Sequence, residues 1–217
     1  LGIQMGPNDG TSSTDTFIDR VTGPGRVIVG GSGNDSPNNC HIRRTVTQQE
    51  VGKPLSTFIR YVYNVSAKDT GGNVCVWADK GARLNVALVL YKLSTKEEVE
   101  RAVLDFDDQL HRLTLGENVG GYFNGATEIN PLNGKTHAEI SSKVTSLPTD
   151  YAIAFEVTPL DPCEINIWAD QGASLTSNEK KGFMEPEGDG STVTEIGGTA
   201  KRVITVGAYT TRNEFML

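Results

Sequence analysis

Short apolar segments follow one another from about Cys40 to Thr176, and turn residues bound nearly every one of them. The eight segments are residues 41–47, 55–65, 74–78, 84–93, 120–129, 137–144, 151–157 and 164–169. Strands of this length, separated by turns such as residues 70–73 and 130–134, are typical of an antiparallel β-sandwich. The middle of the chain is therefore predicted to be mainly β. The one helical pattern, residues 95–102, predicts a turn or two of helix in a surface connection.

The two ends of the chain have a different pattern. The first thirty residues predict a strand, a helix and a second strand: an apolar start, a capped helix over residues 13–22 and the β-branched run Val27–Val29. The two strands are expected to be parallel and buried. Ser12 is predicted to cap the helix. A second β-branched run, residues 203–209, predicts another buried strand near the end of the chain. The ends are thus expected to form short α/β pieces beside the sandwich.

Composition and charge exclude several classes of protein. The chain has 217 residues, with 20 basic against 27 acidic side chains and a net charge of −7. Without a basic cluster, nucleic acid is not an expected partner. No apolar run approaches the roughly 20 residues that a membrane-spanning helix needs. The three cysteines lack metal-binding spacing, so we expect neither a metal nor another cofactor.

A glycine-rich stretch ends the Val27–Val29 run and leads to Asn34. Gly30, Gly31 and Gly33 allow close approach of the backbone to a ligand. An amide that follows such a backbone can donate a hydrogen bond to a developing oxyanion in a hydrolase. The alternative is an ordinary strand followed by an Asn/Asp/Ser turn.

The remaining residues provide no complete hydrolytic triad. Ser12 follows Gly-Thr, as some peptidase nucleophiles do, but the residues after it fit a helix cap better. His41, His111 and His137 are neither next to a glycine-rich turn nor spaced as metal ligands. We therefore expect none of the three to be a catalytic base.

Two tryptophans occur in a repeated pattern, in which Trp-Ala-Asp-x-Gly-Ala ends a strand at Trp77 and again at Trp168. One interpretation is a pair of aromatic platforms that bind a carbohydrate or a peptide. The other, which we favour, is two neighbouring strands whose indoles fill the sandwich.

The outer segments together resemble the subtilisin-like serine peptidases (subtilases). The resemblance rests on Leu1-Gly2, the helix at 13–22, the run Val-Ile-Val-Gly-Gly-Ser-Gly-Asn at 27–34, and Arg-Val-Ile-Thr-Val-Gly-Ala-Tyr at 202–209, in that order. In the family a strand reading Ala-Ala-Ala-Gly-Asn follows the helix, and a later strand reads Val-Ile-x-Val-Gly-Ala.

The resemblance implies a role for several residues. Asn34 would be the asparagine of the oxyanion hole. Leu1, Gly2, Gly30, Gly31, Ser32 and Gly33 would line the primary specificity pocket, although the family usually has alanines where Gly30, Gly31 and Ser32 stand. The catalytic aspartate, histidine and serine would all lie outside this chain.

The resemblance also implies an account of the middle of the chain. Some bacterial subtilases carry a jelly-roll β-sandwich between the oxyanion asparagine and the Val-Gly-Ala strand. Residues 1–38 and 185–217 would then belong to the catalytic core, and residues 39–184 would be the inserted, jelly-roll-like sandwich.

The function implied is that of a fragment of an exported bacterial serine endopeptidase, inactive by itself, whose parent enzyme hydrolyses peptides or proteins. Export would place it in the medium, the periplasm or the cell surface. The alternative is a non-catalytic sandwich that binds carbohydrate or protein through Trp77 and Trp168. A pseudoenzyme whose triad has been lost is a third possibility. The sequence leaves the oligomeric state open.

Overall fold

The computed structural model describes residues 4–33, 39–61, 63–64, 69–117, 119–170, 172–176, 188–193 and 198–207. The chain divides into two compact units, Leu1–Asn34 with Val193–Leu217, and Asp35–Thr192. The first contains α1 (Ser13–Val21), β1 (Val29–Gly31) and β14 (Ile204–Val206). The second contains β2 (His41–Val46), β3 (Leu55–Tyr61), β4 (Tyr63–Asn64), β5 (Asp69–Lys80), β6 (Leu84–Lys92), β7 (Glu97–Leu104), β8 (Leu110–Leu113), β9 (Gly120–Ile129), β10 (Lys135–Ser146), β11 (Tyr151–Pro159), β12 (Cys163–Asp170) and β13 (Ala173–Thr176).

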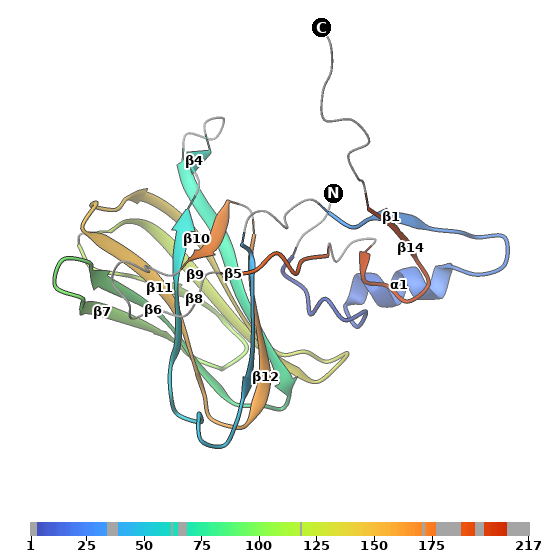
Figure 1. Cartoon of the computed structure of the whole chain (residues 1–217), viewed down its shortest axis with the longest axis horizontal. Helices are drawn as coiled ribbons and strands as arrows, with labels where there is room; N and C mark the ends of the chain where they lie inside the picture. Colours follow the sequence, from blue (N-terminus) through green and yellow to red (C-terminus); the bar gives the residue numbers. More distant parts are fainter. Residues whose placement is uncertain are drawn as a thin grey trace, which may run out of the picture. The chain divides into compact units, whose positions relative to one another are not determined.

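The second unit is an antiparallel β-sandwich (Figure 1). In the described residues, one sheet has the strand order β2-β12-β5-β10-β9-β8, with β4 paired to β5, and the other has the order β13-β3-β11-β6-β7. Neither sheet closes into a barrel. The predicted mainly-β class and the antiparallel sandwich are therefore confirmed.

Alternation along each strand places apolar side chains between the two sheets. On β6, Leu88 and Leu90 are fully buried in the core, and on β12 Ile165 and Ile167 are also fully buried there. Burying each such side chain stabilises the fold by about 1.5–3 kcal/mol before conformational entropy is counted. Phe155, on β11, is fully buried in the same core. The period-two pattern thus decides which face of each strand is internal.

The helical prediction for residues 95–102 was wrong. Glu97–Leu104 is the edge strand β7, which pairs with β6 from Glu97↔Lys92 to Leu104↔Val86. Glu97 and Glu98 are exposed on this strand and Glu100 is half-buried, while the open edge of β6 provides backbone partners. Tertiary pairing therefore overrides a weak local preference.

The helix of the first unit begins where the sequence predicts. The Oγ of Ser12 accepts a hydrogen bond of 3.1 Å from the N–H of Asp15, so the predicted cap is confirmed. The buried carboxylate of Asp15 accepts from the hydroxyl of Thr199 at 3.0 and 2.9 Å. This contact joins the two segments that form the unit, although they come from opposite ends of the chain.

β1 and β14 pair in parallel, with Val29 opposite Ile204 and Gly31 opposite Val206. The expected burial of this run is wrong, because Val29 is 61% exposed and Ile204 is 54% exposed. In the described part of the unit, the sheet formed by β1 and β14 has only two strands, and side chains on it remain exposed to solvent. The strand expected before α1 is also not found, since residues 4–10 form bends and residues 1–3 lie outside the described residues.

Candidate functional site

The glycine-rich segment predicted to contact substrate lies at the carboxyl end of β1. The N–H of Ser32 donates to the carbonyl of Val206 at 3.0 Å, which continues the pairing with β14. Gly33 has φ of 91°, a left-handed conformation that favours glycine. A Cβ placed on Gly31 would meet no atom within 4 Å, so its backbone borders open space.

The other residues of this predicted site are not placed. Leu1, Gly2 and Asn34 lie outside the described residues. The role of Asn34 in an oxyanion hole and the specificity pocket with Gly30, Gly31, Ser32 and Gly33 therefore stay predictions.

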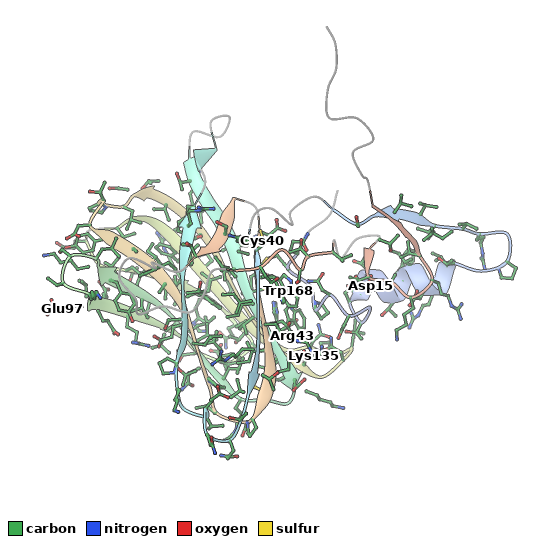
Figure 2. All side chains as sticks on the ribbon, viewed as in Figure 1. Asp15, Cys40, Arg43, Glu97, Lys135 and Trp168 are labelled. Carbon is green, nitrogen blue, oxygen red and sulfur yellow. The ribbon has the colours of Figure 1, made fainter. Side chains whose placement is uncertain are left out.

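The two tryptophans lie on the outer face of the larger sheet, opposite to the core-facing positions of their strands. Trp77 and Trp168 are each 5% exposed. Trp77 stacks on His137, and Trp168, which is labelled in Figure 2, stacks on His41. Buried indoles that are already stacked on imidazoles leave no exposed platform for a ligand. The interpretation of the pair as a binding platform is not supported by this geometry, and neither indole fills the space between the sheets.

Strand register places a row of polar side chains beside Trp77. Across the sheet, Asn166 lies opposite Arg43 and Trp77, and His137 lies opposite Trp77 and Glu128. The five side chains come from β2, β12, β5, β10 and β9, and only the pairing of these strands brings them together. The Nδ1 of His137 is 3.4 Å from Glu128 Oε1. The hydrogen bond and charge of His137 hold the pKa of Glu128 below its ordinary value.

A cleft of about 330 Å³ lies at the β9 end of this row. Its polar lining includes Asp108, Gln109, Glu128, His137 and Glu139. A neighbouring cleft of about 270 Å³ shares Asp108 and Glu128 with the first. The carboxylates of the cleft attract cations and hydrogen-bond donors. The carboxylate of Glu128 is already paired with the imidazole of His137.

The histidines of the described chain are held by acids or amides rather than by a nucleophile. His111 Nε2 lies 2.7 Å from Asp107 Oδ1, and this hydrogen bond, with the charge of His111, lowers the pKa of Asp107. His41 contacts Asp189 and Asn166. No group of three metal-ligating side chains occurs among the described residues, and Cys40, Cys75 and Cys163 are buried thiols that form no disulfide. No helix in the described part of the chain is long and apolar enough to cross a membrane.

Sequence reasoning missed two groupings, the acidic cleft and the contact of His41 with Asp189. The alternation of β9 and β10 indicates that Glu128, His137 and Glu139 face away from the core, which is a signal for a shared polar face. No local signal connects His41 to Asp189, because 148 positions separate them.

Comparison with known proteins gives a likeness to a solved structure. No family model matches the chain, and no curated protein matches it. Among solved structures, the chain is similar to the Clostridium perfringens CspB protease, with a TM-score of 0.61 and 16% identity. The match covers 97% of this chain and 40% of that protein, so the chain spans less than half the length of the protease it resembles.

These findings correct the family assignment drawn from the sequence. Membership of the subtilisin-like family is overturned as an identification, because no family model matches and the likeness has only 16% identity. Motifs as short as Val-Ile-x-Val-Gly-Ala recur wherever a β-branched strand ends on glycine, so their order alone does not define a family. What the comparison establishes is a fold shared with a protease.

Proposed function

We propose that this chain is part of a serine endopeptidase. In this proposal the first unit contributes to the catalytic domain, and the β-sandwich is a separate non-catalytic unit. The observation that carries the proposal is the parallel pairing of β1 with β14, whose apolar side chains are exposed.

Parallel sheets are normally covered on both faces and contain more than two strands. Val29 is 61% exposed and Val206 is 52% exposed, as expected for strands that pack against further strands and helices of a larger protein. The likeness to a protease of which this chain would span 40% supports the same conclusion.

The place of the glycine-rich segment supports a role in substrate binding. Ligands of parallel α/β sheets bind beyond the carboxyl ends of the strands. Gly31, Ser32 and Gly33 lie at the carboxyl end of β1, and Asn34 is the next residue in the sequence. In the proposal, the backbone of this segment binds the peptide substrate together with Leu1 and Gly2, and the amide of Asn34 donates to the oxyanion of the tetrahedral intermediate.

The test of this role uses the full-length protein. Asn34→Ala is expected to lower kcat by about 10²- to 10³-fold with little change in KM, because the lost hydrogen bond forms only in the transition state. Asn85→Ala, which removes an exposed amide from β6, is the matched control and should leave kcat unchanged. An unchanged kcat in Asn34→Ala would reject the role of Asn34.

In this proposal the isolated chain is inactive, because the nucleophile and its base come from elsewhere in the protein. A fluorophosphonate probe, which labels activated serines, is expected to label the full-length protein and not this chain. Stoichiometric labelling of the chain would contradict the proposal. Export from a bacterial cell stays a prediction, and secretion of the full-length protein would test it.

A further inference from the structure

His41 is a buried histidine whose two ring nitrogens both face oxygen acceptors. Its Nδ1 lies 3.0 Å from Asp189 Oδ1, and its Nε2 lies 3.0 Å from Asn166 Oδ1. The side chain is only 6% exposed, and its ring stacks on Trp168 with centroids 4.8 Å apart.

The orientation of the Asn166 amide is determined by a second contact. Its Nδ2 donates to Glu164 Oε1 at 3.3 Å, which leaves Oδ1 as the atom that faces His41. Glu164 in turn pairs with Arg43. A flipped amide would place a donor against His41 but would also turn an oxygen toward the Glu164 carboxylate.

Two acceptors around one imidazole require two N–H donors. A neutral imidazole has one donor, whereas an imidazolium has two. Burial raises the pKa of Asp189, but hydrogen bonds from Ser191 and His41 outweigh it, so this pKa lies below the ordinary value. Asp189 is therefore an anion when His41 changes charge, and only the protonated His41 satisfies both neighbours.

The same contact joins the segment that enters the sandwich to the segment that leaves it. The N–H of Asp189 donates to the carbonyl of His41 at 2.6 Å, and the N–H of His41 donates back at 3.3 Å. A Cβ on Gly188 would clash with the carbonyl oxygen of Asn39, so only glycine fits there. Both segments belong to the second unit.

We propose that His41 is a pH-sensitive clasp, which holds residues 188–191 against the start of β2 when its imidazole is protonated. Loss of the proton removes one of its two hydrogen bonds and leaves a lone pair against an oxygen. Histidines commonly change charge between pH 5 and 8. The ring contacts the Asp189 carboxylate directly, and through Asn166 it is linked to the Glu164–Arg43 pair.

The sign of the effect follows from this geometry. The stabilising contact is present at low pH, where the imidazole is protonated, and is lost when a rise in pH removes that proton. We expect the hydrogen-exchange protection factors of the His41 and Asp189 amides to fall by about tenfold between pH 5 and 8, since a hydrogen bond to a charged group contributes at least that ratio. Protection factors are used because they remove the intrinsic pH dependence of exchange.

Two variants and a control test the clasp. Asp189→Asn and His41→Gln should each abolish the pH dependence of protection at these amides. His111→Gln removes the partner of Asp107, an exposed histidine–aspartate pair elsewhere in the sandwich, and should leave that dependence unchanged. Equal protection at pH 5 and 8 in the unmodified protein, or an unaltered dependence in Asp189→Asn, would overturn the proposal.

A direct measurement covers the case in which a variant does not fold. The ¹⁵N resonances of the His41 ring in the unmodified protein should both have imidazolium shifts at pH 5, and one should move to the shift of an unprotonated nitrogen as the pH approaches 8. A neutral ring at pH 5 would contradict the clasp without any substitution.

Discussion

Gly72 on β5 faces Ala173 on β13, at a point where the two sheets of the sandwich approach each other. A Cβ placed on Gly72 would lie 2.6 Å from both the Cβ and the backbone nitrogen of Ala173. A side chain of any size at position 72 must therefore push the two strands apart.

Gly72→Ala is expected to destabilise the sandwich by about 1–3 kcal/mol, the usual cost of overpacking. The urea midpoint should fall while the slope of the transition stays constant. Gly23→Ala is the control, because a Cβ there would make an ordinary 3.6 Å contact with Arg26. Equal midpoints for both variants would show that the two sheets do not approach closely at Gly72.

Trp77→Ala is expected to cost about 3–5 kcal/mol, since it removes a buried indole and leaves a cavity beside His137. Chemical denaturation followed by far-ultraviolet circular dichroism measures the change. Tyr122→Ala, at a side chain that is 43% exposed, should stay within about 0.5 kcal/mol of the unmodified protein. A small loss at Trp77 would instead indicate an accessible indole, as the binding-platform interpretation requires.

Asp161 should keep its negative charge at pH values well below the ordinary aspartate pKa. Hydrogen bonds from the side chain and the backbone N–H of Arg83 lower the pKa of this carboxyl to about 2. A depressed pKa stabilises the folded state above the ordinary aspartate pKa of about 4, and this contribution disappears as the pH falls toward 2. In a carboxyl NMR titration, Arg83→Gln should move the midpoint back toward the ordinary value. An unchanged midpoint would show that the Arg83 side chain does not hold the carboxylate.

The three cysteines should be present as unreactive thiols. Cys40, Cys75 and Cys163 are buried and form no disulfide. Burial, with the charges of Asp79 and Asp161, raises the pKa of Cys163 to about 11. The thiol reagent DTNB is expected to modify none of them in the folded chain and all three after denaturation without reductant. Recovery of a single thiol after denaturation would reveal a disulfide and contradict this state.

Local patterns in the sequence predict much of the secondary structure. Alternation identifies strands such as β6 and β12, because each has one face in an apolar core. The Ser12 cap predicts the start of α1, because a side-chain oxygen there satisfies a backbone N–H that has no partner within the helix. These features depend on residues that are close together in the chain.

The patterns fail where a distant partner decides the outcome. Residues 97–104 read as helical but pair with the edge of β6. Val29 reads as buried but lies exposed in a parallel pair with β14. Asn34 is predicted from the sequence as part of a site, but the described residues do not include it.

The sequence by itself determined where most of the longer strands of the sandwich lie, where the helix begins and that the middle of the chain forms an antiparallel sandwich. Only the tertiary structure decided that Trp77 and Trp168 lie buried against histidines on an outer face, and that His41 meets Asp189. The physical reason is the distance along the chain over which each interaction acts. Periodicity and capping arise from neighbours within a few residues, whereas strand order and register bring together side chains whose separation in the chain leaves no local signal.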